Sequence, residues 1–513
     1  MKDAPPDLAH TATGSLYDPR SARAILAVLA GVALMVTYVE TMVVPGFRTF
    51  YTFFSGVPYT TIAWILSAYL LVGTVATPIF GKLGDRYGKK RMLLAVMTVY
   101  GIAVSLAGFT PNLGEMLGIS RFDQIYLLIA VRAVQGIGMA MFPLAFAMIP
   151  EVVPAPKVGT SQGIISAMFG GGAAFGLVGG GYVTQQFGWQ VTFHTVIPVA
   201  AILIFLAAIV IRESPSRESR PIDVLGIGSL GFALAMFLLG ITEGADWGWG
   251  RFAAVHWGVL GWGVPEFLIL SGGAAILFVL RELTTPEPAV SFEALRQRNI
   301  WISNVMGVLV GAVQFLFFVT VVILSEDTFP PGFGLSAFRL GLLALPAVGS
   351  MLAFGPVIGW AVSRRGPQPV SIVGFAAMTV GAIGLALDHG TIALVILLSI
   401  PITVGMVAIF IATTNVIVLT VAPEELGIQT GINQTFRNLG SAIGPVVATS
   451  ILASFLTTNW VQVGPGIFLP FASPANVGFV WAMLLAAALA LAGFALSFGL
   501  RNLERMRPRA GSS

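Results

Sequence analysis

Glu40 and Arg132 are ionisable side chains that lie well inside apolar segments of the sequence. Glu40 lies about 16 residues beyond Ala24, where the first apolar segment begins, and this corresponds to about 24 Å along a helix. Arg132 lies about 8 residues, or about 12 Å, into a later segment that begins at Gln124 and runs the opposite way. The two side chains therefore reach a similar depth. Because an ionisable residue at that depth in a membrane is costly, both are candidate functional residues.

Two interpretations of this pair are open. In the first, Glu40 and Arg132 form a static ion pair that holds two helices together. In the second, Glu40 binds and releases a proton, and the nearby cation tunes its proton affinity, because a cation favours the carboxylate while burial disfavours it. We expect the second, so Glu40 and Arg132 are the predicted proton-coupling residues.

A second polar group occupies a later apolar segment. Asn433, Gln434 and Arg437 follow at spacings that place them on one face of a helix. Lipid is an unfavourable neighbour for this face, so we expect it to line a substrate cavity together with Gln135. Hydrogen bonding between helices is the alternative explanation for the same residues.

The composition is typical of a membrane protein. Only 10% of the 513 residues are charged and 56% are hydrophobic, whereas an ordinary soluble domain has about 25% charged residues. Soluble enzymes, nucleic-acid binders and disordered scaffolds are excluded on this ground. The absence of Cys and the scatter of the 4 His predict no metal site. Since the sequence has no phosphate-binding loop and no nucleophile elbow, we expect neither an enzyme nor a resident cofactor.

Fourteen apolar segments are long enough to cross a membrane as helices. If the amino terminus is cytoplasmic, most of the 27 Lys and Arg fall between segments on that side, as the positive-inside rule requires. The prediction is a multi-pass protein of the cytoplasmic membrane with both termini in the cytoplasm. The expected spans are 24–47, 59–80, 92–110, 124–150, 161–186, 191–211, 224–243, 264–281, 302–325, 338–362, 368–387, 392–420, 427–457 and 474–500.

The loop between the second and third spans carries an ordered motif, GKLGDRYGKKR, at residues 81–91. Its glycines permit a tight turn, and a basic loop on the cytoplasmic side would explain its composition alone. The order of its residues, however, resembles the G-x-L-A-D-R-x-G-R-K-x loop of the major facilitator superfamily. The resemblance implies two six-helix halves around a central cavity that work by alternating access. It also implies a gating role for Gly81, Gly84, Asp85, Arg86 and Gly88.

Three further motifs resemble the same superfamily. Residues 132–140, RAVQGIGMA, match its R-x-x-Q-G-x-G-x-A signature. Residues 40–44, ETMVV, resemble its acidic D-x-T-[IV]-V motif, with Glu40 in place of Asp. Residues 172–181, GAAFGLVGGG, resemble the antiporter signature G-x-x-x-G-P-x-x-G-G of exporters, with Leu177 in place of proline. Helix packing through small residues is the alternative for these glycines, which are Gly172, Gly176, Gly180 and Gly181.

The second half of the chain repeats the first loop. Residues 359–366 align with 81–88 without a gap, and Ser363 stands where Asp85 stands. The extra spans 224–243 and 264–281 resemble the inserted helices of the 14-spanner drug/proton antiporter family. The predicted fold is therefore an all-α integral membrane protein of 14 transmembrane helices, with two six-helix halves and two extra helices inserted between them. The predicted divisions are a tail at 1–22, halves at 23–211 and 302–500, a linker with the two additional helices at 212–301, and a tail at 501–513.

The resemblance implies a proton-coupled, multidrug-type exporter that exchanges lipophilic small molecules for protons. An exporter of an endogenous lipid or metabolite, and a membrane sensor with a transporter fold, fit the same motifs. No Asp or Glu lies inside the last six spans, which favours monocationic, zwitterionic or neutral lipophilic substrates over dications. We expect a monomer driven by the proton gradient, whose partners are protons, a lipophilic substrate and the bilayer, and not nucleic acid.

Overall fold

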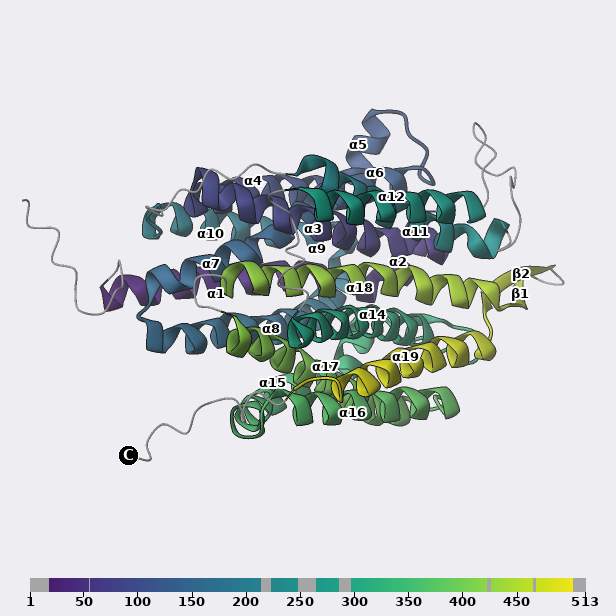
Figure 1. Ribbon diagram of the computed structural model, residues 1–513. Helices are drawn as coiled ribbons and strands as arrows, with labels where there is room; N and C mark the ends of the chain where they lie inside the picture. The colour runs from purple at the N-terminus through teal and green to yellow at the C-terminus, as the bar shows by residue number, and fades with distance from the viewer. Residues whose placement is uncertain are drawn as a thin grey trace, which may run out of the picture.

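The computed structural model describes residues 18–54, 56–213, 223–247, 264–285, 297–421, 426–464 and 467–501, and these residues are almost entirely helical. Figure 1 shows long helices that lie side by side, with a short hairpin of two strands at one end of the bundle. The elements in chain order are α1 (Pro19–Thr41), η1 (Val44–Gly46), α2 (Phe47–Phe53), α3 (Tyr59–Tyr87), α4 (Lys89–Gly108), α5 (Thr110–Met116), α6 (Gln124–Gly136), η2 (Ile137–Ala140), α7 (Met141–Val152), α8 (Ala155–Phe187), α9 (Trp189–His194), α10 (Val196–Val210), α11 (Val224–Trp247), α12 (Val264–Thr284), α14 (Arg298–Glu326), α15 (Ala337–Arg365), α16 (Pro367–Leu387), α17 (Ile392–Thr420), α18 (Leu426–Ser454), β1 (Leu456–Gly464), β2 (Ile467–Pro474) and α19 (Asn476–Ser497). Most of the predicted tails, at 1–17 and 502–513, lies outside the described residues.

Within the described residues, 11 segments are helical, long and apolar enough to cross a membrane. The other three predicted spans, 161–186, 224–243 and 427–457, coincide with α8, α11 and α18. The apolar part of α11 is shorter than a full span and covers Leu225–Ile241. A helical membrane fold is therefore confirmed, and the number of 14 spans stays a prediction.

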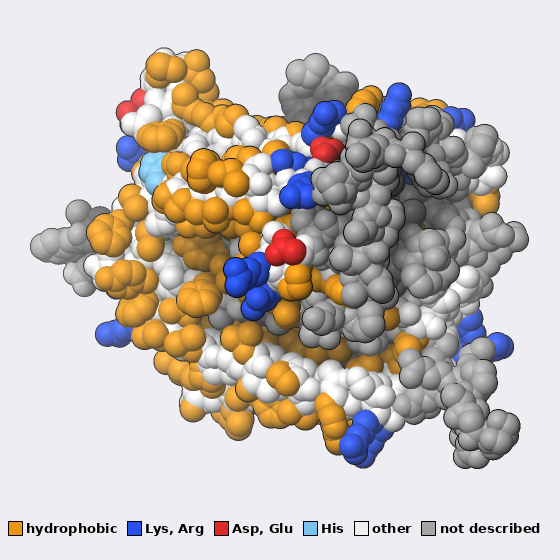
Figure 2. Space-filling view, turned by 90° about the vertical axis from the view of Figure 1, so that its left-hand side faces the viewer, with side chains coloured by type: hydrophobic (Ala, Val, Ile, Leu, Met, Phe, Trp, Pro, Cys, Tyr) orange, Lys and Arg blue, Asp and Glu red, His pale blue; other side chains and the backbone are white. Residues whose placement is uncertain are grey.

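The two ends of the bundle differ in charge. Figure 2 looks onto the end where α1 begins, and Lys and Arg side chains stand out there from a largely hydrophobic surface. We call this the basic end; its described cations include Arg20, Arg23, Lys89, Lys90, Arg91, Arg364 and Arg365. Arg48 in α2 lies at the opposite end, which we call the Arg48 end. This asymmetry is the pattern expected when the basic end faces the cytoplasm.

Single glycines separate consecutive helices at two related turns. Gly88 (φ +105°) lies between α3 and α4, and Gly366 (φ +81°) lies between α15 and α16. Side chains with a Cβ atom rarely adopt this backbone conformation. The two glycines are the last residues of the repeated segments 81–88 and 359–366, so the repeat ends in the same kind of turn both times.

The helices before residue 211 and those after residue 297 pack in two groups, which we call the first and second groups. α1 packs against α8 and α10, and α14 packs against α18 and α19. α11 contacts α3 of the first group and α18 of the second, where the Ser450 hydroxyl donates to the Ile241 carbonyl at 3.0 Å. Arg281 Nε of α12 lies 3.1 Å from Asp223 Oδ2, at the start of α11. The inserted helices therefore form a linked pair, and α11 covers a seam between the groups.

The hairpin of β1 and β2 is absent from the sequence prediction, which extended a span to residue 457 and expected a loop after it. Leu456 pairs with Pro474 and Val461 pairs with Leu469 in an antiparallel register. Residues 456–464 include two Thr, two Val and one Trp, residue types that favour strands. The predicted span continued the apolar helix before them to residue 457, so the strand was not recognised.

Candidate functional site

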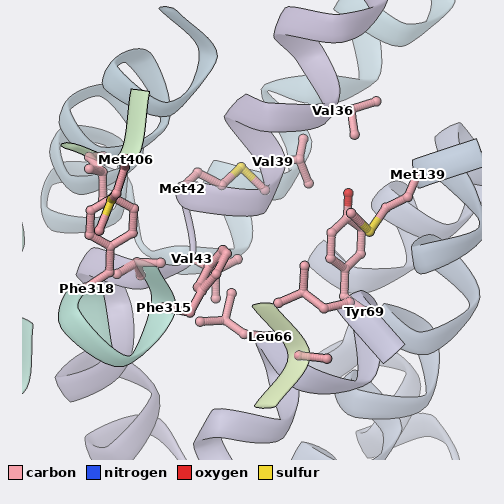
Figure 3. Packing of buried hydrophobic residues seen from close by; sticks show 14 of the residues in the cluster. Val36, Val39, Met42, Val43, Leu66, Tyr69, Met139, Phe315, Phe318 and Met406 are labelled. Atoms are coloured by element: carbon pink, nitrogen blue, oxygen red, sulfur yellow. The ribbon is translucent and has the colours of Figure 1, made fainter. Parts of the chain in front are cut away.

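Glu40 lies in the last turn of α1, inside the bundle. The helix ends one residue later and gives way to η1, where Pro45 has no backbone N–H to donate. Val36, Val39 and Met42 around Glu40 are buried, and Figure 3 shows them among Phe, Tyr and Met side chains. Glu40 itself is only 9% exposed. The fold thus places a carboxyl group in largely apolar surroundings.

Arg132 is completely buried on α6 and is held by neutral polar groups. Its Nε donates to the Ile65 carbonyl of α3 at 3.0 Å, and its Nη1 donates to Gln135 Oε1 at 2.8 Å. The guanidinium carbon lies 4.4 Å from the centre of the Tyr69 ring, a distance typical of a cation–π contact. Its Nη2 has no hydrogen-bond partner among the described residues. One nitrogen of this buried guanidinium, with its two N–H groups, therefore has no acceptor among the described residues.

Glu40 forms no ion pair within 4.0 Å and no hydrogen bond among the described residues. The static ion pair with Arg132, the first of the two interpretations, is therefore not formed here. Two cations nevertheless act on the charge of Glu40, Arg437 more strongly than Arg132. One carboxyl group thus lies within the electrostatic reach of two guanidinium groups, one from each group of helices.

The polar face of α18 makes two kinds of contact. Asn433 Nδ2 donates to Asn304 Oδ1 of α14 at 3.0 Å, so this residue links two helices. Gln434 accepts from Arg437 Nη2 and donates from Nε2 to Asn438 Oδ1 at 2.7 Å. Asn433 thus forms an interhelical hydrogen bond, whereas Gln434 and Arg437 bind to each other within α18.

The loop motif at 81–91 lies at the basic end, where two acids of the first group contact it. Glu213, which follows α10, accepts the backbone N–H groups of Lys90 and Arg91 at 3.1 and 3.2 Å. Lys89 Nζ donates to Glu151 Oε1 of α7 at 2.5 Å. A carboxylate is stabilised at a helix N-terminus, so these contacts fix the start of α4. Sequence reasoning missed both acids.

The predicted gating residues lie in different surroundings. A Cβ atom added at Gly84 or Gly88 would overlap a neighbouring side chain, whereas Gly81 has open space around it. Arg86 is exposed. The side chain of Asp85 lies outside the described part of the structure, so its gating role stays a prediction.

The four glycines of the antiporter-like motif at 172–181 lie at close approaches between helices. A Cβ atom added at Gly172 would lie 2.7 Å from a backbone atom of α1, and one added at Gly180 would lie 2.7 Å from the backbone of Met42, directly after α1. Gly176 also faces α1. Gly181 faces the carbonyl oxygen of Ala337 in α15. Larger side chains at these positions would push the helices apart, so the glycines allow α8 to pack closely against α1 and against α15 of the second group.

The two groups of helices meet at the Arg48 end through an acid that the sequence prediction left in a loop. Glu326 ends α14 and is 3% exposed. Its Oε2 accepts the backbone N–H of Arg48 at 3.0 Å, and Arg48 Nη1 donates to its carbonyl oxygen at 3.1 Å. We call these two bonds the Arg48–Glu326 latch. Beside it, the backbone N–H of Phe338 donates to Gln185 Oε1 at 3.0 Å, so this end of the bundle is closed.

Comparison with known proteins decides the family. The family model described as Major Facilitator Superfamily matches residues 29–445. The chain belongs to the Major Facilitator Superfamily. It is 28% identical to the Tetracenomycin C resistance and export protein of Streptomyces glaucescens over 435 residues, 82% of this chain and 76% of that protein. It is 26% identical to the Multidrug transporter protein MdtP of Bacillus subtilis over 398 residues, 76% of this chain and 68% of that protein.

Solved structures share the Major Facilitator Superfamily fold. The human organic anion transporter MFSD10 (TETRAN) superposes with a TM-score of 0.59 at 16% identity, covering 94% of this chain and 100% of that one. The xylose transporter XylE from E. coli, in a partially occluded inward open conformation, gives a TM-score of 0.61 at 12% identity, covering 96% and 100%. The relatives are transporters rather than enzymes, so this member of the superfamily is a multi-pass membrane transporter.

Proposed function

We propose that the protein exports lipophilic small molecules across the cell membrane by alternating access, in exchange for protons carried by Glu40. The family and the drug-exporting relatives support a drug-type exporter. The observation that supports proton exchange is a buried carboxyl group with no ion pair and no hydrogen bond among the described residues.

The proposed coupling follows from the cost of burying a charge. A carboxylate without hydrogen bonds is unfavourable in an apolar interior, and protonation removes that cost. Arg437 and Arg132 act in the opposite direction and favour the ionised form. Closing the protein around Glu40 therefore requires either a proton or a substrate that pairs with the carboxylate. A carrier that closes with one or the other, but not both, exchanges the substrate for the proton.

We place the basic end in the cytoplasm and the Arg48 end outside. The cations at the basic end support this orientation, because basic loops stay on the cytoplasmic side. The closely packed glycines of α8 and the linked pair of α11 and α12 support membership of the 14-spanner drug/proton antiporter family. Protons then enter from the Arg48 end as the substrate leaves there.

The test uses proteoliposomes that contain the purified protein and the lipophilic dye rhodamine 6G under an imposed pH gradient. Glu40→Gln mimics the protonated acid, and Glu115→Gln alters an exposed acid of α5 as the matched control. We expect the Glu40→Gln variant to let the dye equilibrate but not to accumulate it, and to release no protons when dye is added in detergent. A Glu40→Gln variant that pumps and releases protons like the wild type would exclude this residue as the proton carrier. Dye binding without any dye-dependent proton flux in the wild type would favour the sensor.

A further inference from the structure

Two runs of residues at four-residue intervals lead along the helices to the Arg48 end. They are Glu40, Val44 and Arg48 along α1, η1 and α2, and Phe318, Val322 and Glu326 along α14. Four residues advance an α-helix by about 6 Å. The outermost pair forms the Arg48–Glu326 latch, and the middle pair, Val44 and Val322, lines one cavity. This cavity therefore lies between Glu40 and the closed end.

The cavity is lined by side chains from η1, α8, α14, α15 and α17. Among its described lining residues only Ser399 is polar, and its hydroxyl donates to the Val395 carbonyl of its own helix at 2.6 Å. The volume of the cavity is about 40 Å³, whereas one water molecule needs about 10–15 Å³. The cavity thus has room for a small group but offers it no free hydrogen-bond donor.

The chemistry of the lining selects the occupant. Apolar cavities in proteins stay dry and accept apolar molecules, whereas a charged or strongly polar group loses its hydration there without compensation. Phe317 and Phe318, whose ring centres are 5.6 Å apart, form part of the wall. The volume suits an apolar substituent or the edge of a ring rather than a whole drug molecule.

We propose that this cavity is an exit subsite, which holds an apolar, uncharged substituent of the exported molecule after the molecule has left the level of Glu40. This inference rests on the proposed export function. Both groups of helices build the wall, since Val44 and Leu177 come from the first group and Val322 and Ala347 from the second. A subsite made by both groups is complete only while the Arg48 end is closed. Opening the latch takes the wall apart and releases the substituent.

The absence of Cys from the chain makes the test direct, because one introduced Cys is the only reactive thiol. Ala347→Cys places a thiol in the cavity wall, and Ala353→Cys places one on the exposed face of the same helix as the matched control. Each full-length variant in proteoliposomes is treated with N-ethylmaleimide, with and without Nile red, an uncharged apolar dye. At about ten times its dissociation constant the dye should slow alkylation of the Ala347→Cys variant about tenfold, and leave the Ala353→Cys variant unchanged.

A second substitution tests the volume of the cavity. Ala344→Leu, added to the Ala347→Cys variant, fills the cavity from the same helix and should abolish the protection by dye, whereas Ala353→Leu should preserve it. Equal alkylation rates with and without dye, or no binding of Nile red to the wild type, would overturn the subsite. If Ala347→Cys does not fold, Ala344→Cys reports from the same wall with Ala347→Leu as the filling change. Alkylation needs no pH gradient, so loss of proton exchange as the function leaves this result unchanged.

Discussion

Gly341 on α15 offers a direct test of how the Arg48 end is held closed. An alanine Cβ atom at this position would lie 2.8 Å from the Leu177 carbonyl oxygen and 2.9 Å from Val178 Cα, both backbone atoms of α8. Neither atom moves without its helix, so α8 and α15 must separate by about 0.6 Å to restore contact at 3.4 Å. Gly349 on the same helix has open space around it. Gly341→Ala therefore opposes closure, and Gly349→Ala is its matched control.

The expected magnitude follows from the cost of this overlap. Overpacking of a close contact costs about 1–3 kcal/mol, which changes the ratio of two states by about 5- to 150-fold. Alanine also favours a helix over glycine by about 1 kcal/mol, but this gain is present in both variants and cancels in the comparison. The ratio of open to closed Arg48 ends should therefore rise by about 5- to 150-fold in Gly341→Ala relative to Gly349→Ala.

Electron–electron double resonance measures this ratio as a distribution of distances. Spin labels on cysteines introduced at Glu115 and Asp388 report on the separation of the two groups, because both residues are exposed at the Arg48 end. We expect longer distances to gain population in the Gly341→Ala variant only. Identical distributions in the two variants would show that the close approach of α8 and α15 does not hold this end closed.

Three other changes test separate parts of the site. Arg132→Lys keeps the charge but cannot donate to both Ile65 and Gln135 from one planar group, so dye export should fall about tenfold with dye binding retained; export at the wild-type rate would contradict this. Gly88→Ala should lower the free energy of unfolding by about 1–3 kcal/mol, because the φ of +105° and the nearby Glu213 exclude a Cβ atom. In thermal unfolding, Gly88→Ala should be less stable than the control Gly81→Ala, because Gly81 has open space around it. Burial raises the pKa of Asp327 above 3.8, against the hydrogen bond from Phe329 and the charge of Arg48. The folded state therefore keeps this proton to a higher pH than the unfolded state, and the free energy of unfolding falls as the pH rises from 3.8 through the raised pKa. Asp327→Asn should flatten the plot of the free energy of unfolding against pH in that window. An unchanged slope of that plot would refute the assignment.

Local sequence was sufficient to single out Glu40 and Arg132, because an ionisable residue well inside an apolar segment is conspicuous. Glu326 was not singled out, because an acid at the end of an apolar run and before Asp327 is typical of a loop. Its partner Arg48 lies 278 residues earlier in the chain, and no local pattern connects two such positions.

The position of Arg437 shows the same limit. Spacing placed Gln434 and Arg437 on one helical face, where they bind each other, and their role in a substrate cavity stays a prediction. The electrostatic influence of Arg437 on Glu40 depends on how α18 of the second group packs near α1 of the first. That packing is tertiary, so counting acids and bases along single spans could not give the charge around Glu40.

Coupling between Glu40 and the latch has two structural routes, and their stiffness differs. The direct route runs along the chain from α1 to α2, but it crosses η1, where the helix is interrupted at Pro45 and bends easily. The second route runs through α8, whose adjacent Gly180 and Gly181 lie against the backbone of Met42, directly after α1, and the backbone of Ala337 in α15. Close-packed backbones transmit a displacement with little loss. We therefore expect a shift of α1 at Glu40 to reach the second group mainly through α8, so the glycines of α8 serve the exchange as well as the packing.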